Sequence, residues 1–290
     1  MDITLLGFLT QLLNGLALGS CFALLAIGLS IIFGLLFVVN FAHGAFYMLG
    51  AYFAVFTLGL TGNFWVAMVV SFLAVGLVGV ITEYFTLKPL YGKDPILPLL
   101  LTFGLSMASV GAVHLIFGSS PRALKAPAFI SGPIDLGFIY YSKYHLFVIF
   151  ATVVLTILVW LLLGKTNLGM LIRAGTQDRM MARSLGINVD RLFTVVFGIG
   201  IALAALGGMI SVPIRGAYPE MGMEILIQCF VVVSVGGLGS FWGSVVAALL
   251  IGECMTLSIL IWPPLASISI YLLMAAVLLT KPEGLFGAQV

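Results

Sequence analysis

Residues 3–82 contain no Asp, Glu, Lys or Arg and read ITLLGFLTQLLNGLALGSCFALLAIGLSIIFGLLFVVNFAHGAFYMLGAYFAVFTLGLTGNFWVAMVVSFLAVGLVGVIT. A helix needs about 20 mostly apolar residues to cross a bilayer, so this stretch has room for about three or four crossings. The whole chain of 290 residues is 62% apolar and 8% charged, whereas about a quarter of the residues in a soluble domain are charged. One globule of this size cannot bury so much apolar surface, and the sequence therefore predicts a protein embedded in lipid.

Breaks at Gly, Pro or charged residues divide the chain into apolar runs. Two short runs, about 29–40 and 225–238, predict broken or re-entrant helices, which are tolerated where they line a cavity. The longer runs predict spans at 7–28, 44–60, 64–87, 96–117, 144–163, 192–213, 240–260 and 264–280. The predicted fold class is all-α, a polytopic transmembrane helical bundle of about eight spans plus two short segments.

Lys and Arg are concentrated in two loops. The segment 164–191, here called the coupling segment, contains Lys165, Arg173, Arg179, Arg183 and Arg191, and the loop 88–94 contains Lys88 and Lys93. Because cytoplasmic loops carry an excess of these residues, both segments are expected inside the cell, with 118–143 and 214–224 outside. Lys281 suggests a cytoplasmic C-terminus, which depends on how the run 225–238 is counted.

The coupling segment has the pattern of a short helix below the membrane. Thr176 is the expected cap, Asp178 would lie in the first turn, and Gly186 suits the C-terminal end, where a positive φ is needed. The helix would present an apolar face through Met181, Ala182 and Leu185 and a basic face through Arg179 and Arg183. Such a helix suits docking into a groove of a partner; an ordinary basic loop, or docking onto the protein's own spans, is the alternative.

Polar and glycine residues interrupt the chain at 40–44 and 236–240, and both stretches are candidates for the substrate path. Asn40 is expected to cap a helix that begins near Ala42, whose free N–H groups would suit a carboxylate. The alternative is structural: Asn40 and His43 satisfy one another and nearby carbonyl groups and hold a tight bend. The candidate path residues are Asn40, Phe41, His43, Gly44, Tyr47, Gly236, Gly237, Gly239 and Ser240. Gly236, Gly237 and Gly239 also favour a helix break. The alternative is a close helix crossing, because Gly239 and Gly243 form a pair of small residues four apart, as do Gly15 and Gly19.

Glu253 lies midway along an apolar run and is a possible intramembrane acid with a role in transport, unless it reaches the membrane interface. The residues needed to bind ATP, a metal ion or nucleic acid are missing from the sequence. Gly164-Lys165-Thr166 resembles the end of a phosphate-binding loop, but Val159 occupies the position of the required first glycine. The histidines have no metal-ligand spacing, and no basic run suggests nucleic acid. The sequence thus predicts a transport subunit, not an enzyme, without its own ATP-binding site; an ion-coupled secondary transporter is the rival.

Several motifs resemble those of the branched-chain amino-acid ABC transporter permease family. They are Asn14-Gly15-Leu16, Phe22-Ala23-Leu24, Val39-Asn40-Phe41-Ala42-His43-Gly44, Tyr47-Met48-Leu49-Gly50-Ala51-Tyr52, Arg173-Ala174-Gly175-Thr176-Gln177-Asp178, the stretch 182–188, Gly236-Gly237-Leu238-Gly239-Ser240 and the stretch 281–287. The resemblance covers nearly the whole chain apart from 118–143. It implies a single permease domain over 1–290 with the coupling segment at 164–191.

The resemblance also implies an assembly in the bacterial or archaeal cytoplasmic membrane. A second, related permease would form a heterodimer with this chain, two cytoplasmic subunits would bind ATP and Mg, and a periplasmic or extracellular binding protein would deliver substrate. The residues carried over as coupling positions are Arg173, Asp178, Arg179, Met181, Ala182, Leu185 and Gly186. Leucine, isoleucine and valine are the expected substrates, and similar permeases take urea, short amides or other small carboxylates. Lipid is the other expected partner, and no nucleic acid is expected.

Overall fold

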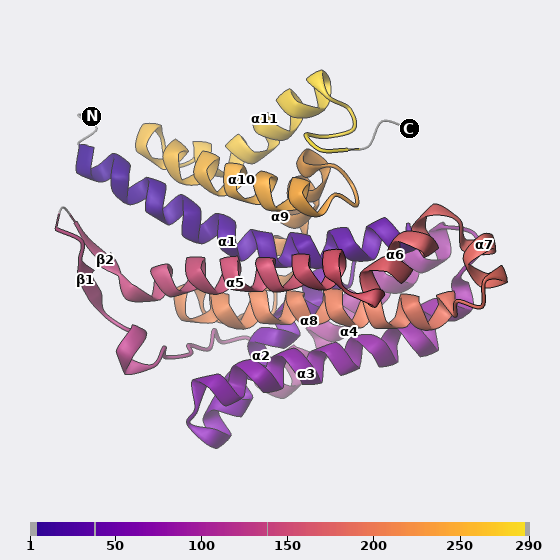
Figure 1. Ribbon diagram of the computed structural model, residues 1–290. Helices are drawn as coiled ribbons and strands as arrows, with labels where there is room; N and C mark the ends of the chain where they lie inside the picture. The colour runs from indigo at the N-terminus through magenta and orange to yellow at the C-terminus, as the bar shows by residue number, and fades with distance from the viewer. Residues whose placement is uncertain (1–4, 38, 138, 288–290) are drawn as a thin grey trace.

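The structure, a computed structural model, describes residues 5–37, 39–137 and 139–287. It is a bundle of helices with one small β-hairpin (Figure 1). The elements in chain order are α1 (Leu5–Leu36), α2 (His43–Thr61), α3 (Phe64–Thr82), a π turn η1 (Glu83–Leu87), a 3-10 turn η2 (Lys88–Leu90), α4 (Ile96–Phe117), η3 (Ala128–Ile130), β1 (Pro133–Asp135), β2 (Tyr140–Ser142), α5 (Lys143–Lys165), α6 (Asn167–Gln177), α7 (Arg179–Ser184), α8 (Val189–Arg215), α9 (Met221–Gly236), α10 (Phe241–Ile261) and α11 (Leu265–Thr280).

Seven helices in the described part of the chain are long and apolar enough to cross a membrane. They are α1, α2, α3 with its two following turns, α4, α5, α8 and α10. The predicted polytopic helical bundle is confirmed. The run 225–238 forms the short helix α9, as expected, and the predicted span 264–280 forms α11, which has only 16 residues.

The run 29–40 is not a separate short segment, and the prediction of one there was wrong. Helix α1 continues without a break for 32 residues and ends at Leu36. Its glycines mark close contacts with other helices: a Cβ on Gly28 would overlap the carbonyl oxygen of Gly200 in α8. The chain leaves the helix at Phe37, whose φ is +54°. The first real break therefore lies between α1 and α2, and residues 37 and 39–47, which include the first turn of α2, are hereafter called the first break.

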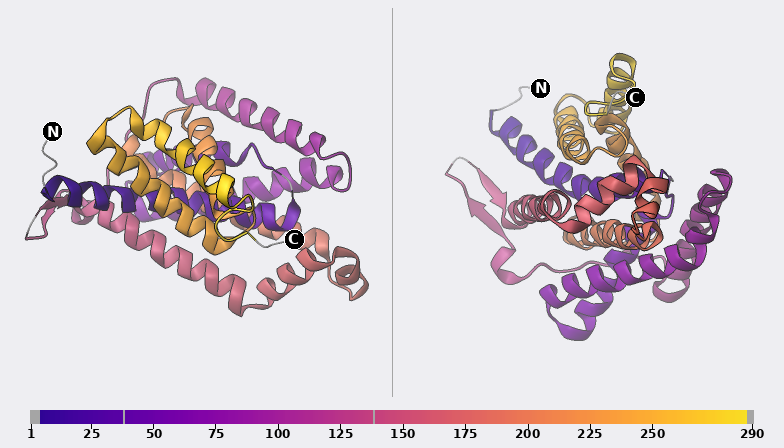
Figure 2. Two further views of the ribbon diagram at one scale, coloured as in Figure 1. Left: turned by 90° about the horizontal axis from the view of Figure 1, so that it is seen from above. Right: turned by 45° about the vertical axis from the view of Figure 1, so that its right-hand side comes forward.

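The centre of the bundle is formed by α1 and α8, which are buried along most of their length, while α3, α4 and α5 bury only a narrow stripe. Helix α1 lies between α8 and α10 (Figure 2). The crossing with α10 is close, since a Cβ on Gly19 would lie 2.8 Å from the carbonyl oxygen of Ala248. The predicted small-residue contact at Gly15 and Gly19 is thus present.

The loops divide between the two ends of the bundle. The coupling segment and the loop 88–94 share one end, where the rings of Tyr91 and Phe193 are 5.5 Å apart. At the other end, Arg122 and Ala217 form an isolated β-bridge that joins 118–143 to 214–224. The hairpin of β1 and β2, which the sequence analysis did not predict, lies at this second end (Figure 1). The loops therefore group in the predicted pairs, and the membrane side that each pair faces stays a prediction.

Candidate functional site

The coupling segment folds into two short helices, α6 and α7, separated by Asp178. The Oδ1 atom of Asp178 accepts hydrogen bonds from the backbone N–H groups of Met180 and Met181, each over 2.9 Å. The predicted cap at Thr176 was wrong: Thr176 lies within α6 and donates its hydroxyl to the carbonyl of Arg173. Asp178 is a stronger acceptor, and its extended backbone ends α6 and starts α7. Gly186 has φ +82° just after α7, as predicted.

Arg179 points back onto the protein's own bundle. Its Nη2 donates a 2.8 Å hydrogen bond to the carbonyl oxygen of Leu35. The guanidinium carbon lies 4.9 Å from the ring centroid of Phe193 and 5.7 Å from that of Phe37. Burial, and secondly the charge of Arg183, lower the pKa of Arg179, whose guanidinium nevertheless stays protonated at neutral pH.

Arg183 points elsewhere and forms a 2.7 Å ion pair with Asp190. The prediction that Arg179 and Arg183 share one basic face was therefore wrong. Arg173, also a predicted coupling residue, donates to the carbonyl of Leu163 and closes the turn between α5 and α6.

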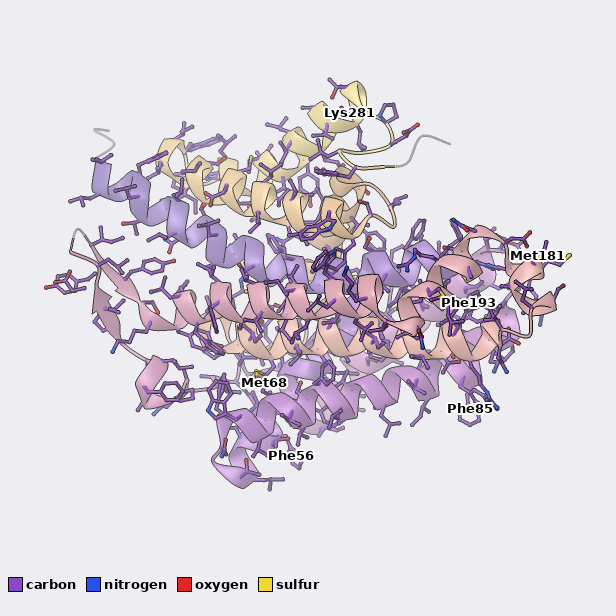
Figure 3. The ribbon with its side chains drawn as sticks, viewed as in Figure 1. Phe56, Met68, Phe85, Met181, Phe193 and Lys281 are labelled. Atoms are coloured by element: carbon purple, nitrogen blue, oxygen red, sulfur yellow. The ribbon has the colours of Figure 1, made fainter. Side chains whose placement is uncertain are left out.

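Large apolar side chains cover the tip of the coupling segment. Met180, Met181 and Leu185 are 80%, 59% and 74% exposed, and Met181 projects from the end of the bundle (Figure 3). Ala182, predicted on the same face, is buried against the bundle. A groove of about 420 Å³ runs beside this tip and is lined by Leu168, Leu171, Leu185, Gly186, Ile187, Asn188, Arg191, Leu192 and Val195. The segment thus combines an anchored arginine with an exposed apolar surface.

A buried acid that the sequence analysis did not single out lies near Arg179. Glu83 is fully buried at the start of the π turn, and its Oε1 accepts a 2.7 Å hydrogen bond from the hydroxyl of Tyr91. The pKa of Tyr91 is raised above its usual range by burial first and by this bond second. Tyr91 in turn packs edge-on against Phe193, the ring beneath Arg179. The sequence does mark this acid, because Glu83 is the first charged residue after the charge-free stretch 3–82.

The polar residues of the first break have structural partners. Asn40 Oδ1 accepts from the N–H of Ala42 over 3.0 Å, close to the predicted cap, and α2 begins at the next residue. His43 Nε2 lies 3.0 Å from the carbonyl oxygen of Leu25 and must carry the proton, because a carbonyl only accepts. The N–H of Phe41 donates to Thr102 Oγ1 in α4. These bonds fix a tight bend to α1 and α4, as in the structural alternative. Asn40 and His43 do not bond to each other, however, and Asn40 Nδ2 and His43 Nδ1 are buried without a partner among the described residues.

Two further first-break residues join α2 to its neighbours. A Cβ on Gly44 would overlap the carbonyl oxygen of Gly222 in α9, so the helices touch backbone to backbone. Tyr47, fully buried, donates its hydroxyl to Ser211 Oγ over 2.7 Å, and Ser211 donates to the carbonyl of Gly208. Tyr47 is thereby linked to α8.

The second break, residues 237–240, connects α9 and α10. Gly237 and Gly239 have φ of +102° and +80°, values that favour glycine. Ser240 Oγ accepts from the N–H of Gly243 and caps α10. The C-terminal motif packs here, since the N–H of Phe286 donates to the carbonyl of Gly236 over 3.0 Å. The glycine-rich motif 236–240 and the C-terminal motif 281–287 thus pack against each other.

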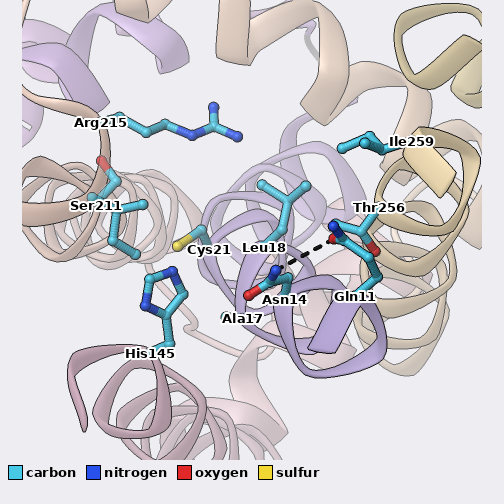
Figure 4. Close-up of a pocket in the computed structure, with 11 residues that line it drawn as sticks. Gln11, Asn14, Ala17, Leu18, Cys21, His145, Ser211, Arg215, Thr256 and Ile259 are labelled. Atoms are coloured by element: carbon cyan, nitrogen blue, oxygen red, sulfur yellow. Dashed lines mark hydrogen bonds between the residues drawn. The ribbon is translucent and has the colours of Figure 1, made fainter. Parts of the chain in front are cut away.

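A cavity of about 320 Å³ lies between α1, α5, α8 and α10, at the end opposite α7 (Figure 4). We call it the polar cavity. Its polar lining residues are Gln11, Asn14, His145, Ser211, Arg215 and Thr256. Its other lining residues are Ala17, Leu18, Cys21, Ile214 and Ile259. None of these residues was among the predicted site residues. Ser211 connects the cavity to Tyr47 of the first break.

Glu253 lies beside the polar cavity without lining it. Its carboxylate packs against Gly15 of α1, next to the hydroxyl of Thr256. Its buried Oε2 has no hydrogen-bond partner among the described residues. Tyr141 donates to Asn14 Oδ1 over 3.2 Å, and its pKa is raised to about 12 by burial and then by the charge of Glu253. Glu253 is therefore at the helix contact of α1 and α10, within electrostatic reach of the cavity wall.

Long apolar helices, two interior breaks and a polar cavity at one end define a multi-pass membrane protein with the architecture of a transport permease. Comparison with known proteins gives the family. The chain belongs to the family described as branched-chain amino acid transport system / permease component, whose model matches residues 11–278.

Three relatives align with this chain over most of their length. The chain is 29% identical over 294 residues to the high-affinity branched-chain amino acid transport system permease protein BraD of Pseudomonas aeruginosa, covering 97% of this chain and 96% of the relative. It is 29% identical over 303 residues to LivH of Escherichia coli K12, a permease of the same description, with coverage of 99% and 98%. A probable branched-chain amino acid transport permease protein LivH of Methanocaldococcus jannaschii is 27% identical over 283 residues, with coverage of 92% and 88%. No solved structure matches the chain significantly.

Proposed function

We propose that this permease is the pore-forming subunit of an ABC importer that carries leucine, isoleucine, valine or similar small amino acids into the cell. The family's description and the names of its relatives, which specify branched-chain amino acid transport, support this choice. ATP and Mg would be bound by partner subunits. Urea, short amides and other small carboxylates are the alternative substrates.

The observation that carries the coupling role is the exposed apolar tip of the coupling segment. Met180, Met181 and Leu185 leave large apolar surfaces outside the bundle, where water or another protein must cover them. The adjoining groove of about 420 Å³ offers a concave surface for a partner's side chains. A cytoplasmic ATPase subunit placed there would push on α7, and Arg179 would pass the movement to α1.

The complete assembly would contain a second, related permease, two ATPase subunits and a substrate-binding protein outside the membrane. In this arrangement the two permeases form the passage together, and the binding protein contributes much of the substrate selectivity. Arg173, Asp178 and Gly186 shape the coupling segment, while Met181 and Leu185 would touch the ATPase.

Purification from native membranes in mild detergent tests the proposal. We expect the chain to co-purify with a second permease and two ATPase chains, and leucine uptake by proteoliposomes to require ATP and the binding protein. Uptake driven by an ion gradient with no ATPase chain present would contradict the proposal and favour a secondary transporter.

A further inference from the structure

One charged side chain, Arg215, lines the polar cavity together with neutral polar and aliphatic residues. Arg215 is the last residue of α8 and faces the cavity from one side (Figure 4). Leu18, Ile214 and Ile259 provide aliphatic surface around it. Pockets for small molecules commonly combine such apolar walls with a few placed polar groups. A ligand that fits this cavity carries an anionic group and an aliphatic part.

Arg215 is exposed, and its guanidinium makes no hydrogen bond or ion pair within the described chain, although a second, small pocket is lined by both Arg215 and Glu224. The nearby acids are engaged elsewhere: Glu220 lies 3.1 Å from His114, and Glu224 accepts from the hydroxyl of Tyr218. A guanidinium presents a planar fork of donors that matches a carboxylate. Arg215 is therefore free to bind the carboxylate of a solute.

Acceptors lie on the opposite side of the cavity. His145 lines it across from Arg215, with Cys21 between them (Figure 4), and neither of its ring nitrogens has a hydrogen-bond partner among the described residues. In the neutral ring one nitrogen accepts, and Nε2 is the nitrogen that a solute can reach, because Nδ1 is buried. Asn14 also lines this part, and the carboxylate of Glu253 lies behind it against Gly15. This side of the cavity attracts a cation.

We propose that the polar cavity binds the zwitterion of an aliphatic α-amino acid. The carboxylate would accept from the Arg215 guanidinium, the ammonium would donate to His145 Nε2, and the side chain would pack on Leu18, Ile214 and Ile259. This inference rests on the proposed function and assigns the binding groups of that substrate. It separates amino acids from urea and short amides, which lack the carboxylate that Arg215 selects.

The cavity also has a physical link to the first break. Ser211 lines the cavity and accepts the hydroxyl of Tyr47, which lies on the first turns of α2. A solute that donates a hydrogen bond to Ser211 Oγ would compete with the Tyr47 hydroxyl for this acceptor. Solute binding in the cavity would therefore weaken the bond that holds α2 to α8.

Substitution of Arg215 in the complete reconstituted complex tests the proposal. We expect Arg215→Gln to raise the KM for leucine uptake on the order of 10- to 100-fold, the effect of losing a charge-assisted hydrogen bond. Arg215→Lys is expected to recover part of the loss, because it keeps the charge but not the fork. Lys125→Gln is the matched control: it removes one positive charge at the same end, outside the cavity, and leaves the KM unchanged.

Thiol labelling provides a second measurement that does not depend on turnover. Ile259→Cys, in a chain whose three native cysteines are replaced by alanine, places a thiol in the cavity wall at a half-exposed position. We expect methyl methanethiosulfonate to modify it, and leucine to slow the reaction while urea does not. Absence of labelling without leucine, or labelling that leucine leaves unchanged, would overturn the proposal.

The two proposals fail in different ways. If the wild-type complex imports leucine with ATP but Arg215→Gln behaves like Lys125→Gln, the importer stands and the assignment of the cavity is overturned. If the wild-type complex imports no amino acid, the proposed function itself fails. Import of urea that is unaffected by Arg215→Gln would overturn both.

Discussion

The guanidinium of Arg179 donates a hydrogen bond to the carbonyl oxygen of Leu35 over 2.8 Å and so fastens α7 to the last turn of α1. The opposite half of α1 lines the polar cavity through Asn14, Leu18 and Cys21. One unbroken helix of 32 residues thus joins the coupling segment to the cavity. A displacement of α7 is expected to move α1 as a unit, which gives the two ends of the bundle a direct mechanical connection.

Removal of the Arg179 bond should uncouple the coupling segment from α1. A hydrogen bond with a charged donor contributes about 1.5–3 kcal/mol, and the contacts with Phe193 and Phe37 add to it. We expect Arg179→Gln to reduce leucine uptake on the order of tenfold while ATP hydrolysis persists. Arg179→Lys should recover part of the uptake. Lys165→Gln, in the same segment, is the control, and equal uptake by Arg179→Gln and this control would refute the connection.

Charge on the exposed tip should disrupt partner binding. Met181→Asp and Leu185→Asp place a carboxylate on surface that the proposal buries against an ATPase, and desolvation of an unpaired charge is costly. We expect co-purification of the ATPase subunits to be lost while the permease still folds. Tyr140→Asp, at a side chain that is 75% exposed at the opposite end, is the matched control. Unchanged co-purification of both tip variants would exclude this tip as the docking surface.

The bond between Tyr47 and Ser211 predicts an asymmetric pair of substitutions. Ser211→Ala leaves the buried Tyr47 hydroxyl without an acceptor and should cost about 1–3 kcal/mol of unfolding free energy. Tyr47→Phe should cost about 0.5–1.5 kcal/mol, because Ser211 still donates to Gly208. The double variant should be more stable than Ser211→Ala alone. Thermal unfolding in detergent measures the order of stability of these variants. A double variant that is less stable than both single variants would contradict the prediction.

Backbone contact between α2 and α9 predicts that Gly44 tolerates no side chain. The Cβ of Gly44→Ala would overlap the carbonyl oxygen of Gly222, and overpacking of this kind costs about 1–3 kcal/mol. Gly59→Ala on the same helix is the control, since no atom lies within 4 Å of its added Cβ. Thermal unfolding should show a lower Tm for Gly44→Ala only. Equal Tm values would mean that the two helices separate readily.

Local chemistry made some features predictable from the sequence. The charge-free stretch 3–82 indicated the membrane bundle, Asn40 was placed next to the start of α2, and the positive φ at Gly186 followed from its position after a short helix. Each of these depends on residues that are close in the chain.

The features that the sequence did not predict depend on contacts between residues that are distant in the chain. The run 29–40 was predicted as a separate short segment, but Gly200 and Gly239 approach Gly28 and Gly34 closely and α1 continues to Leu36. The direction of Arg179 depends on Leu35, which is 144 residues away. Arg215 and His145 belong to different helices and meet in one cavity only after folding. No local pattern marks such residues, so the polar cavity could not be found from the sequence alone.

The proposed mechanism requires that the coupling segment lies in the cytoplasm and is covered by an ATPase subunit. Labelling of Met180→Cys with a membrane-impermeant maleimide, in a chain free of native cysteines, tests it most directly. We expect Met180→Cys to react in inside-out vesicles only, and this reaction to be blocked when the ATPase subunits are present, whereas Tyr140→Cys reacts only in right-side-out vesicles. Reaction of Met180→Cys in right-side-out vesicles would exclude a cytoplasmic coupling segment, because no ATP-hydrolysing subunit could then reach α7.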